Sequence, residues 1–277
     1  MRKCLLLLVF GIQPVSGAAA GLGPEKPLTF VVMADPQFGM FSDNAETAWE
    51  EERFERAVEL LNLINPAFVV VCGDLVNRPA DDTQADVLLK MASRIKAPVY
   101  WVPGNHDIGN TPTRKNLDWY RRRFGKDRYC FSHSSYRFLV LNSPLLFDPT
   151  DLQAEAEDQW RWLSSELLKD KRAPFSAVFL HHPPFMKSPD EKDAYTVLPK
   201  QRRNRLLELL KQGGVRAVFT GHHHRNNVTS FGSIPIVTVG PVGKPLGPDP
   251  SGFMVVHLRG KRLYYHYLPL KAKTAVF

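Results

Sequence analysis

Five apolar segments of this chain are each followed at once by residues of the kinds that bind metal ions. Runs of valine, phenylalanine and leucine lead into Asp, Asn and His, in three cases after a glycine. The five junctions are Asp35-Pro36-Gln37, Gly73-Asp74, Gly104-Asn105-His106-Asp107, His181-His182 and Gly221-His222-His223-His224. Such runs predict strands covered on both faces, and the carboxyl ends of strands in an open α/β sheet form a rim where ligands bind. The junctions therefore predict an α/β fold with its chemistry at the strand ends.

The apolar pattern predicts nine strands. Six of them, at 29–34, 67–72, 98–102, 136–141, 176–180 and 215–220, alternate with helical patterns. The last three, at 234–239, 253–258 and 263–268, indicate an antiparallel finish of hairpins. Amphipathic helices are predicted where apolar residues recur on one face, around Phe54, Trp160 and Leu206. No repeat or linker divides the chain, so one α/β domain is predicted over residues 21–277.

Residues 1–20 have the pattern of a secretory signal peptide. Arg2 and Lys3 precede a short apolar stretch, and a tract of small residues follows it. The stretch is too short to cross a bilayer, which favours cleavage near Ala18 to Ala20 over the alternative of a short N-terminal helix or anchor. The expected location is therefore outside the cytoplasm, either secreted or periplasmic.

Composition excludes several classes of protein. The chain is 44% hydrophobic and 23% charged, which is ordinary for a globular protein and argues against disorder. No apolar run reaches the ~18 residues of a membrane span. Three cysteines without a Cys-x-x-Cys pair indicate neither a disulfide scaffold nor a zinc finger, although a Cys72–Cys130 bridge remains an alternative to a core thiol at Cys72.

The net charge of +8 favours anionic partners in general. The basic run at 121–128 either attracts a phosphorylated substrate or is a solvated helix end, and such runs are usually the latter. Aromatic and basic residues do not alternate, so no nucleic-acid platform is predicted.

The residue types at the five junctions indicate a dinuclear metal centre. Carboxylates, an amide oxygen and imidazoles, without thiolates, suit hard or borderline divalent ions such as Mn, Fe or Zn. His222 and His224 lie two apart on an extended segment and so point the same way. Seven or eight ligands exceed one tetrahedral site and fit two ions that share a carboxylate, an arrangement that clamps both oxygens of an in-line phosphoryl displacement. Taken singly, each junction also has a simpler explanation, such as an Asp that caps a turn.

The order of the junctions resembles the signature of the calcineurin-like metallophosphoesterase superfamily, Asp-x-His, Gly-Asp, Gly-Asn-His-Asp, His and Gly-His-x-His. The resemblance covers about Phe30 to Thr238. Segments 35–39, 104–110 and 214–225 are more similar still to the branch named calcineurin-like phosphoesterase domain-containing protein, whose members are described as Ser/Thr protein phosphatases. The resemblance implies a four-layer αββα sandwich with two mixed β-sheets and helices outside.

The resemblance also implies two groups of metal ligands. The first ion would be held by Asp35, Gln37, Asp74 and His224. Asp74 would bridge to a second ion, held also by Asn105, His181 and His222. His182 is the alternative to His181 as the single histidine ligand.

The same resemblance implies the catalytic roles. A hydroxide between the two ions would attack phosphorus, since bound water loses its proton near neutral pH. His106 would give a proton to the leaving oxygen or stabilise the phosphate, and Asp107 would orient the His106 ring.

Gln37 departs from the superfamily, which mostly has histidine at this position. An amide oxygen is a weaker and harder donor than an imidazole. We therefore expect the first site to bind its ion less tightly, or to prefer Mn or Mg over Zn.

The function expected from these residues is metal-dependent hydrolysis of phosphoesters, with phosphomonoesters on a small molecule or a protein as substrates. One alternative is a phosphodiesterase that acts on cyclic nucleotides or glycerophosphodiesters. The other is a non-catalytic protein that binds phosphate esters and lost turnover through Gln37, although binding alone does not need His106. Loops 38–48, 143–152 and 185–198 adjoin the junctions and are expected to shape specificity.

Overall fold

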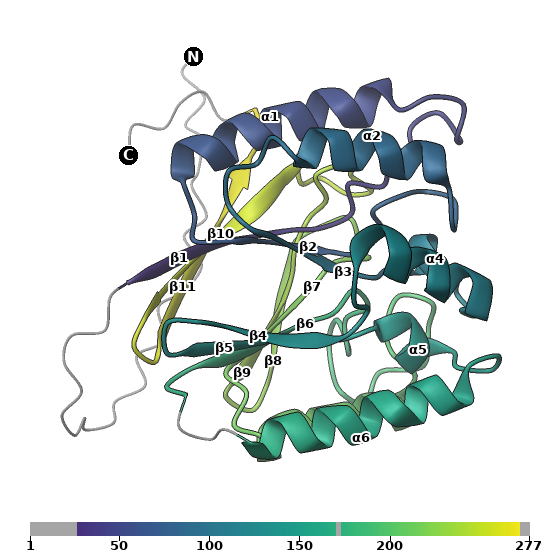
Figure 1. Cartoon of the computed structure of the whole chain (residues 1–277). Coiled ribbons are helices and arrows are strands. Elements are labelled where there is room, and N and C mark those ends of the chain that lie inside the picture. Colours follow the sequence, from purple (N-terminus) through teal and green to yellow (C-terminus); the bar gives the residue numbers. More distant parts are fainter. Residues whose placement is uncertain (1–26, 170–172, 272–277) are drawn as a thin grey trace.

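The computed structural model contains two mixed β-sheets that lie face to face, with helices on both outer sides (Figure 1). It describes residues 27–169 and 173–271. The predicted signal peptide at 1–20 lies outside the described residues, as do both ends of the predicted domain. The four layers confirm the predicted αββα sandwich.

The first sheet has five strands in the order β11-β10-β1-β2-β3. Strands β1, β2 and β3 are parallel neighbours, whereas β10 and β11 form an antiparallel hairpin on the other side of β1. The bounds are β1 Leu28–Met33, β2 Val69–Cys72, β3 Val99–Val102, β10 Gly252–Arg259 and β11 Arg262–Pro269.

The second sheet has six strands in the order β4-β5-β6-β7-β9-β8. Its four central strands are parallel, and an antiparallel strand closes each edge. The bounds are β4 Tyr129–His133, β5 Tyr136–Val140, β6 Ser176–Phe179, β7 Ala217–Thr220, β8 Asn227–Phe231 and β9 Ile234–Thr238.

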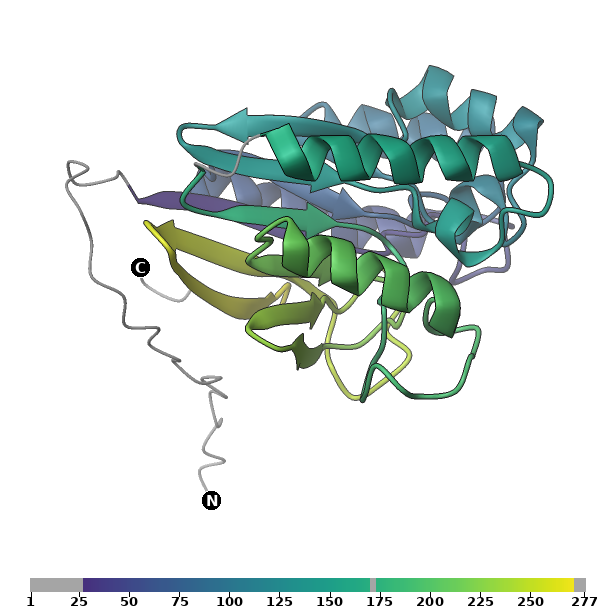
Figure 2. The same cartoon turned by 90° about the horizontal axis from the view of Figure 1, so that it is seen from below.

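Helices cover the outer face of each sheet. Apolar residues of α1 and α2 pack on the first sheet, and those of α6 and α7 pack on the second. Figure 2 shows α6 and α7 side by side on the same face. The bounds are α1 Ala48–Ile64, α2 Asp82–Ala92, α3 Asn105–Ile108, α4 Arg114–Phe124, α5 Ser143–Phe147, α6 Gln153–Lys169 and α7 Lys200–Gln212.

The space between the two sheets is filled by aromatic side chains. Phe30 of β1 is fully buried there. Its ring stacks on Phe68 at 4.8 Å between centroids and meets the edges of Phe138 and Phe219 at 5.5 and 5.9 Å. Because these rings come from both sheets, this cluster holds the two sheets together.

The sequence pattern missed the edge strands β4 and β8, and it misjudged the end of the chain. Residues of β8 alternate between half-buried and exposed, and those of β4 are nearly all half-buried, so neither segment shows the continuous apolar run of a central strand. The last strands do not form one antiparallel set. Strand β9 is parallel to β7 in the second sheet, whereas the β10–β11 hairpin belongs to the first sheet.

The basic run at 121–128 forms ion pairs on the outside of the fold. Arg121 contacts Asp127 at 2.8 Å, Arg123 pairs with Asp86 of α2, and Arg128 pairs with an acidic residue of α6. The run lies at the end of α4, and the described contacts place these three arginines with acidic partners. These arginines are therefore paired with acidic side chains of the run itself, of α2 and of α6.

Cys72 and Cys130 are both free thiols, so the alternative of a disulfide between them is wrong. Cys72 is fully buried between the sheets. Within the described part of the chain, no helix combines the length and apolar character that a bilayer crossing requires.

Replacing Phe30 by alanine tests the aromatic layer between the sheets. Removal of a fully buried ring leaves a cavity, and we expect the free energy of unfolding to fall by roughly 3–5 kcal/mol. Leu63→Ala is the control, because Leu63 is 65% exposed and its loss should change stability by less than about 1 kcal/mol. Urea unfolding of both variants measures the difference, and equal losses would contradict the assigned core.

Candidate metal centre

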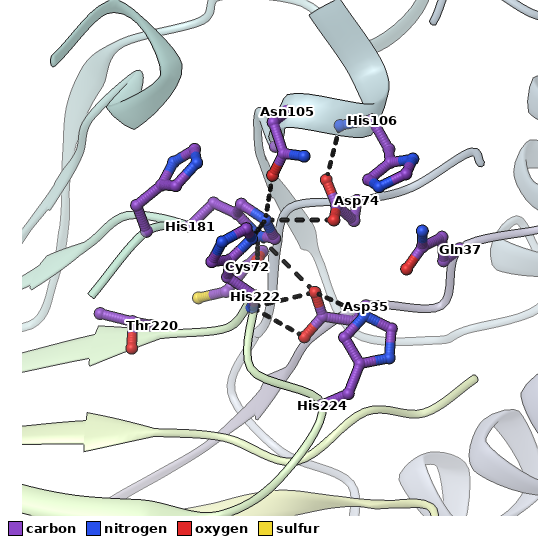
Figure 3. A network of polar contacts seen from close by, with 12 residues as sticks. Asp35, Gln37, Cys72, Asp74, Asn105, His106, His181, Thr220, His222 and His224 are labelled. Carbon is purple, nitrogen blue, oxygen red and sulfur yellow. Dashed lines mark hydrogen bonds and ion pairs between the residues drawn. The ribbon is translucent and has the colours of Figure 1, made fainter. Parts of the chain in front are cut away.

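The five junctions meet where the carboxyl ends of strands from both sheets come together (Figure 3). Asp35 and Asp74 follow β1 and β2 of the first sheet, and Asn105 begins α3 after β3. His181 and His222 follow β6 and β7 of the second sheet. The polar rim is thus shared between two sheets, and the centre depends on how those sheets pack.

The backbone at these junctions is held in an unusual conformation. Five of the predicted ligands have positive φ angles, at 50° for Asp35, 39° for Gln37, 50° for Asp74, 73° for His222 and 52° for His224. Each non-glycine residue in this region costs of order 1–3 kcal/mol, and such residues concentrate at functional sites. Half of the ten described non-glycine residues with positive φ are therefore predicted ligands.

Two glycines allow the loops to approach closely. A Cβ on Gly73, whose φ is +80°, would lie 2.5 Å from the His181 ring. A Cβ on Gly104 would lie 2.2 Å from the backbone of Asp74, although the φ of Gly104 is ordinary. Gly73 thus supplies both a turn and space, whereas Gly104 supplies space alone.

One group of ligand atoms surrounds Nε2 of His181. This nitrogen lies 3.2 Å from Oδ2 of Asp74, 3.0 Å from Oδ1 of Asn105 and 3.1 Å from Nδ1 of His222. All four side chains are buried. These are the residues that the sequence predicted for the second ion.

Backbone carbonyls set the tautomer of each histidine ligand. Nδ1 of His181 lies 2.9 Å from the Cys72 oxygen, Nε2 of His222 lies 3.0 Å from the Tyr195 oxygen, and Nδ1 of His224 lies 2.6 Å from the Lys244 oxygen. A carbonyl only accepts, so each of these nitrogens carries hydrogen. The other nitrogen of each neutral ring then has a lone pair that can bind a cation. Metal sites commonly orient their histidine ligands in this way, by a hydrogen bond from the ring nitrogen that does not bind the metal.

A second group consists of Asp35, Asp74 and His224, whose ligand atoms lie within 4.8 Å of one another. Gln37 completes it, since its Oε1 is buried and has no hydrogen-bond partner among the described residues. Its Nε2 donates to Oδ1 of Asn77 at 2.9 Å, which fixes the direction of the amide. A buried acceptor without a donor is costly unless something positive binds there. The residues thus fit two divalent cations that share Asp74.

Burial and mutual charge shift the titration of this cluster. Burial raises the pKa of Asp35 to about 6, although His224 and His181 oppose the shift. Burial also acts to raise the pKa of Asp74, but His181, His106 and His222 outweigh it and hold that pKa far below its usual range. Burial opposes the charged form of His181, yet Asp74 raises its pKa to about 9. The Asp74 carboxylate thus favours a positive charge beside it, on His181 or on a bound cation.

The predicted role of Asp107 is wrong. Its carboxylate accepts from the backbone N–H groups of Leu75, Val76 and Gly104 at 2.8, 3.2 and 2.7 Å. It therefore locks the loops after β2 and β3 together and does not orient the His106 ring. The carboxylate lies fully buried between those loops, and these three backbone N–H groups satisfy its two oxygens.

The His106 ring is instead oriented by a backbone carbonyl. Its Nδ1 lies 2.7 Å from the Asn77 oxygen, and its backbone N–H donates to Oδ1 of Asp74 at 2.8 Å. Asn77 thus positions two residues of the site. Its backbone carbonyl contacts His106, the predicted proton donor, and its side-chain oxygen accepts from Gln37. The sequence did not reveal this link.

His182 lies outside both ligand groups. Its Nδ1 is 3.0 Å from the Ser143 hydroxyl, and its ring stacks on Phe147 at 4.9 Å between centroids. Its ring also lies 4.5 Å from the ring of His222. His182 therefore packs behind the centre, while His181 faces it.

Tyr195 is a neighbour of the centre that no sequence motif marked. Its hydroxyl accepts from Nδ2 of Asn105 at 2.9 Å, and its ring lies 4.9 Å from that of His222. The loop at 185–198 was expected to shape specificity, but nothing in its composition singled out this residue. Lys244 also contacts the centre, through its backbone carbonyl beside Nδ1 of His224. Its ammonium lies 5.5 Å from the centre of the Phe41 ring.

A family model described as calcineurin-like phosphoesterase matches residues 28–226. The chain belongs to this family. This match confirms the resemblance drawn from the sequence. The protein is therefore a metal-dependent hydrolase of phosphoric esters.

Known proteins similar to this phosphoesterase include the human serine/threonine-protein phosphatase CPPED1. The two are 34% identical over 266 residues, which is 89% of this chain and 85% of the human protein. A probable cyclic nucleotide phosphodiesterase of Rhodococcus erythropolis is 27% identical over 227 residues, covering 76% of this chain and 72% of that protein.

Among solved structures, a dimetal phosphatase from Danio rerio aligns with a TM-score of 0.69 at 18% identity. The alignment covers 88% of this chain and 96% of that chain. At this identity the likeness shows the fold alone, which agrees with the two mixed sheets described above.

Metal binding should release protons and weaken at low pH. At pH 7 His181, with its pKa raised to about 9, holds a proton that a cation must displace, so loading should release about one proton. Below pH 6 Asp35 also becomes protonated. The affinity for the metal ion should therefore fall more steeply with each pH unit below pH 6 than above it.

Calorimetric titration of the metal-free protein with Mn²⁺, in buffers of different ionisation enthalpy, measures both effects. The Asp35→Asn variant is the control, because it keeps an oxygen ligand but cannot titrate, and it should lose the steepening below pH 6. No proton release at pH 7 would contradict the assigned electrostatics.

Proposed function

We propose that this metallophosphoesterase hydrolyses phosphomonoesters, as a protein phosphatase or a related monoesterase. The observation that carries the proposal is the pair of ligand groups that share Asp74, with the backbone of His106 bound to the same carboxylate. The similarity to human CPPED1, which is named a serine/threonine-protein phosphatase, supports monoesters as the substrate class.

Two divalent ions would occupy the centre. One would be held by Asp35, Gln37, Asp74 and His224, and the other by Asp74, Asn105, His181 and His222. When bound, such ions stabilise charge on phosphoryl oxygens and lower the pKa of water. The oxygen-rich first group, with the Gln37 amide where an imidazole would be softer, favours Mn²⁺ or Mg²⁺ there over Zn²⁺.

His106 would handle the proton of the leaving group. Its Nδ1 hydrogen is directed to the Asn77 carbonyl, which leaves Nε2 as the ring nitrogen that can exchange a proton with substrate. To give a proton from Nε2 the ring must begin doubly protonated and end neutral. The Asn77 carbonyl stabilises the charged ring in the first of these states and fixes its orientation in both.

A phosphodiesterase activity is the second candidate. The Rhodococcus erythropolis relative is named a probable cyclic nucleotide phosphodiesterase, and it shares 27% identity with this chain. Hydrolysis of a diester also releases an alcohol whose leaving oxygen needs a proton, so His106 would serve either reaction. The ratio of rates on the two ester classes separates the candidates.

Steady-state rates of the purified protein test the proposal. We expect turnover of a chromogenic monoester and of a phosphoserine peptide with added Mn²⁺, faster than that of a chromogenic diester. Asp74→Ala and His222→Ala should each reduce turnover at least about 100-fold, because each removes a ligand. Parallel assays with Mg²⁺ and Zn²⁺ test the preference attributed to Gln37.

His223→Ala is the matched control for these variants. His223 lies between two ligands in sequence but belongs to neither ligand group, so its rate should stay within about threefold of the unaltered protein. Equal losses in His222→Ala and His223→Ala would contradict the assigned centre. A faster diester rate would favour the second candidate.

We further propose that the chain is exported and that its first residues are removed. The support is the sequence pattern of residues 1–20 and the start of β1 at Leu28, a few residues past the expected cleavage near Ala18 to Ala20. Expression of the full chain in a secreting host should yield a protein whose N-terminus begins at 19–21, as read by N-terminal sequencing. An intact Met1 on the exported protein would refute cleavage.

A further inference from the structure

The loop between β6 and α7 is held from inside by a buried arginine. Arg203 is fully buried, and its Nε and Nη2 donate to the Leu198 carbonyl at 3.1 and 2.9 Å. Its Nη1 donates to the carbonyls of Pro189 and Glu191, both at 2.8 Å. A buried guanidinium is stable only while its donors are satisfied, so these bonds fix the path of the loop.

Glu191 organises the other half of this loop. Its carboxylate accepts from the backbone N–H groups of Met186 and Lys187 at 2.8 and 2.9 Å. The segment that carries Tyr195 is therefore braced on both sides. A side chain on such a segment is positioned before any ligand arrives, which lowers the entropy cost of contacting it.

Tyr195 contacts two ligands of the same group. Its carbonyl accepts from Nε2 of His222, and its hydroxyl accepts from Nδ2 of Asn105, the residue whose Oδ1 lies 3.0 Å from Nε2 of His181. Yet 51% of the residue is exposed to solvent. Tyr195 thus lies at the boundary between the buried ligands and the solvent from which a substrate arrives.

The Tyr195 hydroxyl has a proton to donate. Asn105 supplies the hydrogen bond that the oxygen accepts, and no described residue accepts the phenolic hydrogen. A phenolic hydroxyl ordinarily ionises only at about pH 10, so this oxygen carries its hydrogen at neutral pH. A hydroxyl that accepts from an amide is also a stronger donor, because hydrogen bonds in a chain polarise one another.

We propose that Tyr195 contacts the substrate, its hydroxyl donating a hydrogen bond to an oxygen of the phosphoryl group bound at the centre. The proposal rests on the phosphoesterase function proposed above. The role differs from that of His106, since Tyr195 keeps its proton and stabilises negative charge on the phosphoryl oxygens.

Removal of the hydroxyl alone tests the contact. Tyr195→Phe keeps the ring against His222, and at saturating Mn²⁺ it should lower kcat/KM for a chromogenic monoester about tenfold or more, the usual effect of losing a hydrogen bond to a charged group. Binding of inorganic phosphate, measured by calorimetry on the Mn²⁺-loaded protein, should weaken by a similar factor. The affinity for Mn²⁺ itself should stay within about threefold.

Tyr264→Phe is the matched control. Tyr264 is 41% exposed and lies on β11 in the other sheet, so loss of its hydroxyl should change none of the three measurements. Thermal unfolding of both variants checks that each retains the fold.

Two results would overturn the proposal. One is unchanged kinetics and phosphate affinity in Tyr195→Phe. The other is a loss that appears only at limiting Mn²⁺ and disappears at saturating Mn²⁺, because the hydroxyl would then act only by positioning Asn105 as a ligand. If the unaltered protein hydrolyses no ester, the proposed function fails by itself. Phosphate binding still decides the role of Tyr195, since weaker binding in Tyr195→Phe supports the contact and equal binding refutes it.

Discussion

The buried carboxylate of Asp74 is the group around which the rest of the structure is arranged. A charge with almost no access to water is tolerated only when positive or hydrogen-bonding groups surround it. Asp74 has the His106 backbone N–H at 2.8 Å and Nε2 of His181 at 3.2 Å, and it belongs to both ligand groups. The loops after β3 and β6 meet the loop after β2, and each brings a group that compensates the charge of Asp74.

That convergence requires backbone strain and close contact. Asp74 itself has a positive φ of 50°, and the glycines at 73 and 104 leave room for His181 and for Asp74. Conformations of this kind persist only where the surroundings over-determine them. The surroundings here are the aromatic layer between the sheets and the Asp107 carboxylate, which binds three backbone N–H groups of the two loops.

The centre is also tied to the segments that form its entrance. The carbonyls that orient the histidine ligands come from Cys72 in a central strand and from Tyr195 and Lys244 in surface loops. Loop residues that shape access to the site thus also determine which imidazole nitrogen can bind a cation. A substitution in the loops at 185–198 or 240–251 can therefore alter metal binding without touching a ligand, as second-layer partners of metal sites do.

The sequence by itself determined the central strands and the ligand types at their ends, because buried strands leave a strong local pattern. The order of those ligand-bearing ends resembles a known family, and that resemblance implied the four-layer fold. The sequence did not determine the edge strands β4 and β8, whose residues are mostly only half-buried and so lack a continuous apolar run. It also did not determine the roles of Asp107, Asn77 and Tyr195. Those roles depend on which backbone groups lie beside a side chain once two sheets and three loops have packed together, and a hydrogen bond between residues 29 or 90 positions apart leaves no periodic trace in the chain.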